Sequence, residues 1–379
     1  MRIGINAHFW PNMTVGSGQY LRHMVRELAP LASDHTLILI GEEGAFADGE
    51  RPVETYEVTQ GRIPAGRPAK LWFEQVAVPR AARTLQLDLL HVPYLAPPLF
   101  SPVPTIVTVH DLIPLLLPAY RGSWRKRAYF WLDVQATLRA DRLIAVSEHT
   151  KKDTVRQLGY PGERIDVTHE AAAPALRPAP PAAILDVCQR YDLPERFVLY
   201  LGDTDVRKGV HRLLGAFARW RVGAGDQETG LVIAGPLHPP GGPLFLDLAG
   251  MARSLGIEGV VRFLGPIDEA EKPALYSAAT LFAFLTAYEG FGLPPLEAMA
   301  CGTPVLASNV SSIPEIVDEA GVLVDPFNEE AVVTALGRLL QDASWRAELR
   351  ARGLARAATF SWQRTARETL QAYEKVRGK

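Results

Sequence analysis

Two carboxylates flank a segment rich in glycine and proline. Glu289 and Glu297 stand eight positions apart in the stretch A-Y-E-G-F-G-L-P-P-L-E-A-M-A-C-G-T-P-V-L-A, residues 287–307. In one continuous helix, the second carboxylate would be turned about 80° away from the first. Pro294 and Pro295 favour the first turn of a helix, where a missing backbone N–H costs little. We therefore predict Glu289 on a loop and Glu297 in the first turn of the helix that follows.

Such an arrangement suits a ligand that carries both phosphate and sugar hydroxyl groups. The N-terminal end of a helix attracts anions through its backbone N–H groups and its dipole. Carboxylates accept hydrogen bonds from hydroxyl groups. Gly302 is expected to close the helix, and residues 305–307 read as a buried strand. An ordinary loop–helix–strand unit of an α/β protein is the alternative interpretation.

Adjacent cations follow another predicted strand. Arg207 and Lys208 come after the apolar run 197–201 and just before Gly209, where a helix is expected to begin. A planar guanidinium beside a compact ammonium group matches the charge and geometry of a diphosphate. This pair is therefore a candidate clamp for the same ligand.

The first half of the chain carries two further signals. Gly16-Ser17-Gly18 follows the first predicted strand, at the place where open α/β sheets bind anionic groups, although a plain tight turn uses the same residues. His110 follows the apolar strand 105–109, so we expect it to face a ligand at the carboxyl end of the sheet. A capping or core histidine held by Asp111 is the alternative.

Basic and aromatic residues alternate in residues 121–131, R-G-S-W-R-K-R-A-Y-F-W. One interpretation is contact with an anionic acceptor or a membrane surface. The other is a solvated helix face whose arginines extend over buried aromatic rings, and we favour it.

The elements that must position these residues alternate between strand and helix, which predicts doubly wound parallel sheets. The expected strands cover residues 3–5, 36–40, 88–92, 105–109, 143–146, 165–168, 197–201, 231–234, 260–264, 281–285, 305–307 and 323–326. Residues 48–70 read as irregular. Residues 171–194 are rich in proline and alanine and read as an interdomain linker. Gly235 and Gly265 end two strands and are expected to frame a nucleotide base.

Bulk properties narrow the classes of function. The 379 residues allow two domains, and a net charge of −2 with 22% charged residues gives no electrostatic case for nucleic acid. Cys188 and Cys301 lack metal-ligand spacing, which indicates a reducing compartment without disulfides. The N-terminus reads as a strand rather than a signal peptide, and no segment approaches the roughly 20 apolar residues of a membrane span. We expect a cytoplasmic protein, with peripheral membrane contact left open.

The run 287–307 resembles the nucleotide-sugar signature of retaining glycosyltransferases of family four, in which a second Glu follows the first after seven residues. The resemblance implies the GT-B fold: two Rossmann-like doubly wound parallel-sheet domains facing across a cleft. It places an acceptor-side domain at 1–174 and a nucleotide-sugar domain at 175–357. Residues 358–379 would form a helix that crosses back to the first domain.

The resemblance also implies an activity. The chain would be a hexosyltransferase that moves mannose or glucose, with retention and without metal, from GDP-mannose or UDP-glucose to a glycan, lipid-linked or small-molecule acceptor. GDP-mannose leads because the R-K-G and H-D-L variants look similar to mannosyl-type branches. No cofactor other than the donor is expected. Oligomeric state stays open.

The resemblance assigns roles residue by residue. The catalytic group would be His110, Glu289 and Lys208. The donor-binding group would be Gly16, Gly18, Arg207, Lys208, Gly290, Phe291, Gly292, Leu293 and Glu297. The family's arginine soon after the first glycine of this loop is replaced by Asp203, so Arg207 is the expected substitute. Asp203-Thr204-Asp205 is similar to the metal motif of the unrelated GT-A transferases, but we interpret it as part of the loop.

Two other classes of protein match part of this pattern. A dinucleotide-dependent oxidoreductase would use the first glycine loop, but Leu21 stands where the third glycine of G-x-G-x-x-G belongs. A non-catalytic sugar-binding protein would bind a neutral ligand, which needs no paired cations such as Arg207 and Lys208. Both alternatives leave part of the pattern unexplained.

Overall fold

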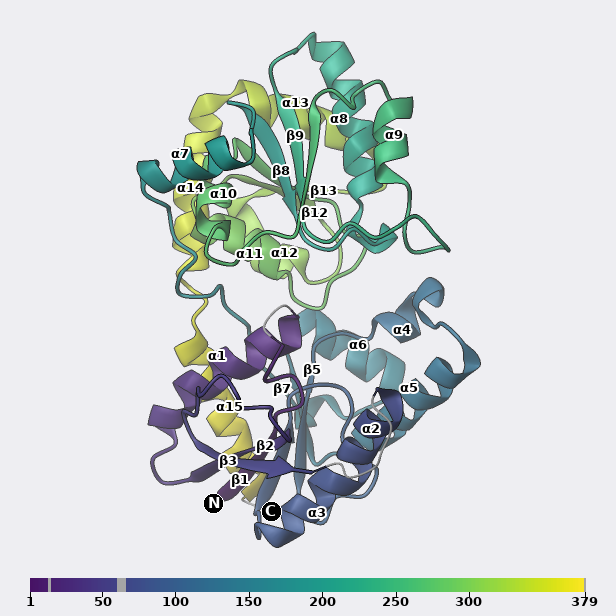
Figure 1. Cartoon of the computed structure of the whole chain (residues 1–379), viewed down its shortest axis with the longest axis vertical. Coiled ribbons are helices and arrows are strands. Elements are labelled where there is room, and N and C mark those ends of the chain that lie inside the picture. The colour runs from purple at the N-terminus through teal and green to yellow at the C-terminus, as the bar shows by residue number, and fades with distance from the viewer. Residues whose placement is uncertain (13–14, 60–65, 378–379) are drawn as a thin grey trace. The chain divides into compact units, whose positions relative to one another are not determined.

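The computed structural model describes residues 1–12, 15–59 and 66–377. The chain divides into two compact units: Met1–Glu170 with Ser361–Lys379, and Ala171–Phe360. Each unit is built on one sheet, and every strand pair in both sheets is parallel (Figure 1). The predicted fold class, two Rossmann-like parallel sheets with alternating helices, is confirmed.

The first unit holds a seven-stranded sheet with the order β3-β2-β1-β4-β5-β6-β7. Its strands are β1 (Arg2–Asn6), β2 (Thr36–Glu42), β3 (Glu54–Val58), β4 (Leu89–Val92), β5 (Thr105–Val109), β6 (Arg142–Ala145) and β7 (Ile165–Val167). Its helices are α1 (Gly16–Leu31), α2 (Arg67–Trp72), α3 (Val78–Thr84), α4 (Ile113–Leu116), α5 (Trp124–Thr137), α6 (Glu148–Leu158) and α15 (Trp362–Arg377). A π-helical turn, η1 (Phe73–Ala77), joins α2 to α3, and short 3-10 turns lie at η2 (Pro118–Tyr120) and η3 (Gly162–Arg164).

The second unit holds a six-stranded sheet with the order β10-β9-β8-β11-β12-β13. Its strands are β8 (Phe197–Leu201), β9 (Gly230–Ala234), β10 (Val261–Gly265), β11 (Leu281–Phe284), β12 (Val305–Ser308) and β13 (Val322–Val324). Its helices are α7 (Pro181–Arg190), α8 (Val210–Ala224), α9 (Leu248–Ser254), α10 (Lys272–Ala278), α11 (Leu293–Ala300), α12 (Ile313–Val317), α13 (Glu329–Gln341) and α14 (Ala343–Ala357), with 3-10 turns η4 (Val206–Lys208) and η5 (Asp318–Ala320).

The reading of residues 48–70 as irregular is wrong for residues 54–58 and 67–70, and residues 60–65 of that range lie outside the described residues. β3 forms the edge of the first sheet and pairs with β2, and α2 begins at Arg67. The sequence of β3, E-T-Y-E-V, carries two carboxylates and no fully buried residue. Charged, half-exposed strands are typical of sheet edges, and they lack the apolar run that marks a central strand.

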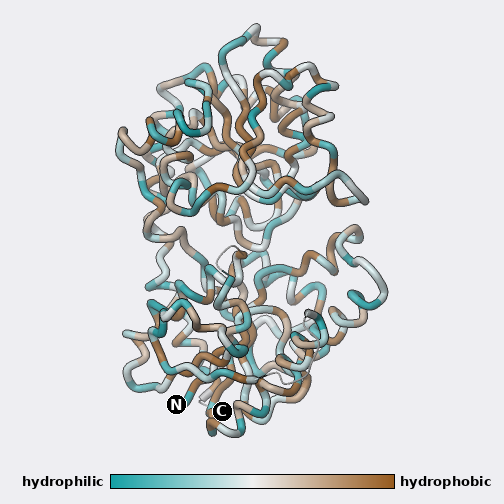
Figure 2. Tube along the Cα trace, in the orientation of Figure 1, coloured by the Kyte–Doolittle hydropathy of each residue, from teal (hydrophilic) through white to brown (hydrophobic). Residues whose placement is uncertain are grey.

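Hydrophobic strands form the centre of each unit. The strands appear as brown, hydrophobic stretches inside both units (Figure 2). Every residue of β5, β8 and β9 is buried, as expected for parallel strands covered on both faces. No helix in the described part of the chain is long and apolar enough to cross a bilayer.

The last helix completes the first unit. α15 packs against α1, where the rings of Trp362 and His23 stack with centroids 5.1 Å apart. Farther along, the Tyr373 hydroxyl lies 2.7 Å from Nδ1 of His91 in β4, and both residues are fully buried. The C-terminal residues therefore contribute to the core of the first unit.

Candidate active site

Arg207 and Lys208 lie in a short turn after β8, next to the loop that follows β11. Asp205 caps the turn by accepting a hydrogen bond from the Arg207 N–H at 2.9 Å. Gly209 has φ +75°, and a Cβ there would lie 2.0 Å from the carbonyl oxygen of Leu285. Glycine is thus required where η4 approaches the end of β11. The Ala287 N–H donates to the Arg207 carbonyl at 2.7 Å, which ties the two loops together.

The structure brings three of the predicted site residues into direct contact. Oε1 of Glu289 lies 2.7 Å from Nζ of Lys208 and 2.8 Å from Nη1 of Arg207. The Thr286 hydroxyl donates to the same oxygen at 3.1 Å. The three charged side chains are only 10–13% exposed. Buried ion pairs of this kind are shielded from salt and from competing water.

Electrostatics keep Glu289 ionised. Burial alone would raise the pKa of this carboxyl group, but the charges of Lys208 and Arg207 and the hydrogen bonds to Oε1 outweigh it. The pKa of Glu289 therefore lies below its usual value. Asp205 adds a second carboxylate 3.5 Å from Nη2 of Arg207. The two cations thus face two carboxylates, which balance their charge.

Two serines hold the Glu289 loop, and the sequence reasoning gave them no role. The Glu289 N–H donates to Oγ of Ser311 at 2.9 Å, and the Ser312 hydroxyl donates to the Glu289 carbonyl at 3.0 Å and to the Phe291 carbonyl. Ser311 has φ +55°, a conformation that non-glycine residues adopt rarely. Both serines directly precede α12, and only the fold shows that their hydroxyls reach back to the Glu289 loop.

The segment Gly290–Leu293 leads into α11. Gly292 has φ +118°, and a Cβ there would lie 2.8 Å from Cδ1 of Ile313, so a side chain would be strained and crowded. Phe291 is buried and meets the Phe360 ring edge-on at 6.0 Å. Pro294 and Pro295 carry no N–H, which leaves Leu293 as the only backbone donor among the first three helical residues. This helix end therefore offers an anion fewer backbone N–H donors than the start of a helix without prolines.

Glu297 lies in the second turn of α11, not in the first turn as predicted. The helix begins at Leu293, so Glu297 is its fifth residue. Its side chain is 7% exposed, and the Tyr276 hydroxyl donates to Oε2 at 2.8 Å. Burial raises the pKa of Glu297, although the charge of Lys272 lowers it in part. The two carboxylates of the motif thus have pKa values shifted in opposite directions.

Three glycines meet at the carboxyl ends of adjacent strands. Gly202 follows β8, Gly235 follows β9 and Gly265 ends β10. The Gly235 N–H donates to the Gly265 carbonyl at 2.7 Å, and a Cβ on Gly235 would lie 2.0 Å from the Gly202 carbonyl oxygen. Gly235 therefore has a packing reason to be glycine, whatever it contributes to binding.

Asp203 and Asp205 both have protein partners. Oδ1 of Asp203 lies 2.8 Å from Nε2 of His238 and accepts from the Thr204 N–H at 2.6 Å. Asp205 faces Arg207, as described above. Among the described residues, no group of three or more His, Cys, Asp and Glu side chains is arranged to hold a metal ion.

Glu170 holds the His110 ring in the first unit, and the charge of Asp111 adds to its effect on the His110 pKa. Nδ1 of His110 lies 2.9 Å from Oε1 of Glu170, and Nε2 lies 3.0 Å from the carbonyl oxygen of Pro93. Burial lowers the pKa of the imidazole, but the hydrogen bond and charge of Glu170 outweigh it, so the pKa is raised. Because both nitrogens face acceptor oxygens, the geometry favours the imidazolium form.

The two glycines of the first loop differ. A Cβ on Gly18 would lie 1.8 Å from the carbonyl oxygen of Asn12, so the close approach of that loop to α1 requires glycine. Nothing lies within 4 Å of the equivalent position on Gly16, the first residue of α1. Packing therefore explains Gly18 and does not explain Gly16.

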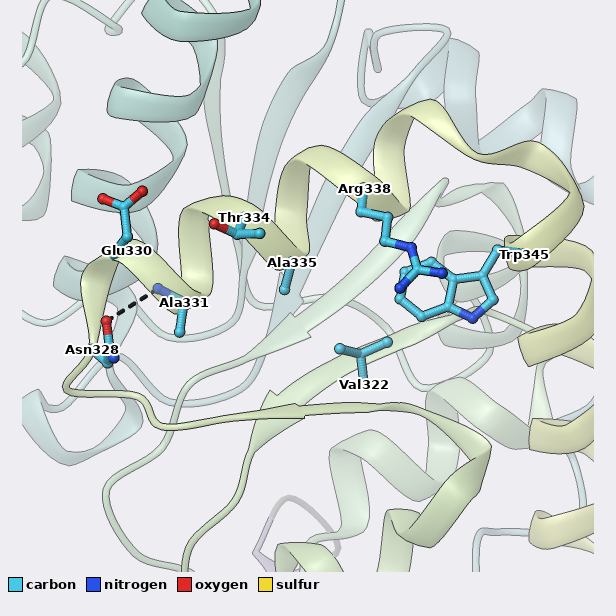
Figure 3. A pocket seen from close by; sticks show the side chains of 8 residues that line it. All are labelled: Val322, Asn328, Glu330, Ala331, Thr334, Ala335, Arg338 and Trp345. Atoms are coloured by element: carbon cyan, nitrogen blue, oxygen red, sulfur yellow. Dashed lines mark hydrogen bonds between the residues drawn. The ribbon is translucent and has the colours of Figure 1, made fainter.

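A separate hollow of about 480 Å³ lies beside α13 in the second unit (Figure 3). The guanidinium of Arg338 stacks over the Trp345 indole at 4.0 Å, and Asn328 caps α13 by accepting from the Ala331 N–H at 3.1 Å. None of the predicted site residues lines this hollow. Among its polar side chains, Asn328 caps α13 and Glu330 pairs with Arg219 of α8.

Two family descriptions match the chain. Residues 15–172 match glycosyltransferase family 4, and residues 189–356 match glycosyl transferases group 1. The O-antigen chain mannosyltransferase B of Escherichia coli is 35% identical over 71% of this chain and 70% of its own length. The D-inositol 3-phosphate glycosyltransferase of Salinispora tropica is 38% identical over 72% of this chain, and the match spans 59% of that relative.

Solved structures share the fold at low sequence identity. Sucrose-phosphate synthase from Thermosynechococcus elongatus has a TM-score of 0.76 and 22% identity, covering 100% of this chain and 99% of that one. The Anabaena protein HepE, solved with UDP and glucose, has a TM-score of 0.75 and 20% identity, covering 99% of this chain and 100% of that one.

Proposed function

This chain belongs to glycosyltransferase family 4, the group 1 glycosyltransferases, and we propose that it transfers a hexose from a nucleotide-diphosphate sugar. The proposed sugar is mannose or glucose, with GDP-mannose as the leading donor and UDP-glucose as the second. Similarity to an O-antigen chain mannosyltransferase supports mannose, and HepE, solved with UDP and glucose, supports the second donor. The proposed acceptor is a glycan, a lipid-linked glycan or a small molecule.

The contact of Arg207, Lys208 and Glu289 is the observation that carries this proposal. A diphosphate leaving group gains negative charge as its bond to the sugar breaks, and a prearranged pair of cations stabilises that charge. In the ligand-free chain, Glu289 holds both cations in place at 2.7–2.8 Å. A bound diphosphate would share these cations with Glu289, so little reorganisation would be needed during the reaction.

The proposed reaction retains the configuration at the anomeric carbon. The bond between that carbon and the diphosphate oxygen breaks, and the electron pair leaves with the nucleotide diphosphate. The acceptor hydroxyl oxygen forms its bond on the same face, and its proton passes to the departing phosphate oxygen. Positioning and charge stabilisation then supply most of the rate enhancement. No metal takes part in this scheme.

The remaining site residues keep their predicted roles as proposals. Glu297 accepts hydrogen bonds from the ribose hydroxyls, and the segment Gly290–Leu293 orients the sugar together with Glu289. His110 contacts the transferred sugar, which requires it to exchange its bond to Pro93 or Glu170, because both ring nitrogens are occupied. Gly16 and Gly18 leave room for the donor or the acceptor.

Donor binding and product analysis test the proposal. A thermal-shift panel of GDP-, UDP-, ADP- and TDP-sugars should show stabilisation by one class, and by GDP-mannose above the others. Lys208→Ala should abolish the shift, whereas the control Arg253→Ala, at a side chain 65% exposed on α9, should not. Proton NMR of the product should show the anomeric configuration of the donor. Absence of binding to every nucleotide sugar would overturn the proposal.

A further inference from the structure

One segment of the first unit is apolar yet contains no buried residue. From Ile113 to Leu132, through α4, η2 and the first half of α5, every side chain is half-buried or exposed. Trp124 is 72% exposed and Trp131 is 62% exposed. The favoured interpretation of this stretch, arginines covering buried rings, is therefore wrong for both tryptophans. Large exposed aromatic side chains of this kind mark interaction surfaces rather than ordinary solvated faces.

The charge of the same segment has a single sign. Residues 113–132 contain Arg121, Arg125, Lys126 and Arg127 and no acidic residue. Within the part of the chain that the structure describes, no carboxylate forms an ion pair with any of these four side chains. The Arg125 guanidinium instead lies over the exposed Trp124 ring at 5.4 Å.

A hollow of about 430 Å³ lies between α4 and α5, which are neighbours at one edge of the first unit (Figure 1). Its wall is apolar, and two arginines stand among the apolar residues. It is lined by Pro114, Leu115, Arg121, Arg127, Ala128, Phe130, Trp131 and Val134. The Arg121 side chain donates to the Leu115 carbonyl at 3.2 Å, which fixes that guanidinium beside the wall.

Tyr129 and the second half of α5 anchor the helix, so its exposed part is not simply a loose helix. The Tyr129 hydroxyl donates to the buried carboxylate of Glu74 in η1, and Asp133, Ala136 and Thr137 are buried. The helix is thus packed on the first unit, while Trp124, Trp131 and its basic side chains stay exposed.

We propose that this surface, residues 113–131, binds the face of a bilayer that contains anionic phospholipids. Tryptophan rings favour the boundary between headgroups and acyl chains, where one end is apolar and the other wet. Arg121 and Arg127 would pair with lipid phosphates at the hollow, and its apolar wall would receive part of an acyl chain. The segment has four cations and no acidic residue, so its charge is complementary to that of a negative membrane surface. A typical protein interface mixes both signs of charge.

This surface lies close in sequence to a proposed site residue, which links it to the proposed function. Binding of the surface to a bilayer does not depend on that function. α4 begins three residues after His110, which follows β5. A bilayer bound at residues 113–131 would therefore concentrate membrane-borne acceptors near the first unit. This deepens the acceptor class proposed above to one carried by a lipid.

Vesicle co-sedimentation of the full chain tests the proposal. Vesicles of phosphatidylcholine with about a third phosphatidylglycerol should bind the protein, whereas pure phosphatidylcholine should bind it at least tenfold more weakly. Binding should weaken as salt is raised, because exposed charges are screened. The double variant Arg121→Glu, Arg127→Glu should lose at least tenfold in partitioning. The control Arg80→Glu, Arg83→Glu makes the same change of net charge at exposed positions of α3 and should bind as the unchanged chain does.

A second pair of variants separates the apolar contribution from the charge. Trp124→Ala with Trp131→Ala should reduce binding to anionic vesicles several-fold. Phe100→Ala is the matched control, because Phe100 is 73% exposed and also carries a stacked guanidinium, that of Arg139 at 4.8 Å. Thermal stability and nucleotide-sugar binding should be unchanged in all these variants, which would show that each one folds.

Three results would overturn the proposal. These are equal binding to the two kinds of vesicle, no binding to either, and binding that survives both double variants. Sedimentation velocity identifies the main competing occupant, a second copy of the chain. A dimer that the tryptophan variant dissociates, without vesicle binding, would assign the surface to self-association instead.

Discussion

At the carboxyl end of each sheet, neighbours of opposite charge shift the pKa of one ionisable side chain, and the sign of the charge differs between the two units. In the first unit, the carboxylate of Glu170, 2.9 Å from Nδ1, raises the pKa of His110. In the second unit, two cations within 2.8 Å of Oε1 lower the pKa of Glu289. Each site therefore holds a partly buried charge that one or two neighbours of opposite sign stabilise.

The partners differ in how the chain supplies them. Glu170 lies 60 positions after His110, just beyond β7, and a separate strand brings it back. Arg207 and Lys208 follow β8, which pairs directly with β11, the strand that leads to Glu289. In parallel sheets the carboxyl ends of paired strands lie side by side, so the cluster of the second unit follows from strand order alone. In the first unit, His110 follows β5 and Glu170 follows β7, and β6 lies between these two strands.

Removal of Glu289 should have the largest effect on this comparison. Glu289→Ala removes the carboxylate that two largely buried cations share, and we expect the free energy of unfolding to fall by about 3 kcal/mol. Sugar transfer should fall at least a hundredfold. Urea unfolding and initial-rate assays measure the two effects.

Glu330→Ala is the matched control for that experiment. Glu330 also pairs with an arginine, Arg219, but its side chain is 66% exposed, so its loss should cost less than about 0.5 kcal/mol. Combining Glu289→Ala with Lys208→Met should recover part of the lost stability, because one buried cation is removed as well. Equal losses for Glu289→Ala and the control would contradict the assignment.

Glu297 offers the contrast within the second unit. Its carboxylate has a neutral partner, Tyr276, and its pKa is raised rather than lowered. We expect Glu297→Ala to weaken nucleotide-sugar binding by about 2 kcal/mol, roughly thirtyfold, because a buried hydrogen bond to ribose is lost. Isothermal titration with the matched donor measures the change. Unchanged affinity would remove Glu297 from the donor site and leave it as a partner of Tyr276.

The first unit and the second should also respond to pH in opposite directions. The folded pKa of His110 is raised, so its stabilising contribution is fully present below the unfolded value near 6.5 and is lost as pH rises through the folded pKa. The folded pKa of Glu289 is lowered, so its contribution is present above the unfolded value near 4.5 and is lost as pH falls through the folded pKa.

Two variants separate these contributions. Glu170→Gln should lower the His110 pKa, which NMR of the imidazole protons would record, and flatten the stability profile above pH 6.5. Glu289→Gln should flatten the profile below about pH 4.5 instead. A His110 resonance that titrates at the same pH in Glu170→Gln would show that the carboxylate does not set its charge.

Local patterns predicted much of this molecule, and contacts between distant residues account for most of the rest. β5 and β8 were expected at Thr105–Val109 and Phe197–Leu201, and these are their observed bounds, because continuous apolar runs mark buried parallel strands. β3 was missed because its charged residues suit an edge. The sequence predicted that Arg207, Lys208 and Glu289 bind the same ligand. The ion pairs between them could not be found without the fold, and neither could Glu170 and Ser311.

Two further errors have local causes. Pro294 and Pro295 suit the first turn of a helix and so predict Glu297 in that turn, but the helix starts at Leu293 after Gly292, which places Glu297 in the second turn. Trp124 and Trp131 were expected beneath arginines because sequence alone does not tell which half of α5 packs on the protein. The buried residues of that helix all lie in its second half.

Metal removal should have the smallest effect, and it distinguishes the two interpretations of Asp203 and Asp205. We expect transfer to proceed unchanged after treatment with EDTA. Asp205 accepts from the Arg207 N–H at 2.9 Å and lies 3.5 Å from its guanidinium, so a metal ion would have to compete with a cation that is already in place. A metal ion at Asp205 would also weaken the contact between Asp205 and Arg207, and the proposed reaction needs Arg207 in place. Activity that is lost in EDTA and returns with manganese would show that this loop binds metal, and Asp203→Asn should then abolish the recovery.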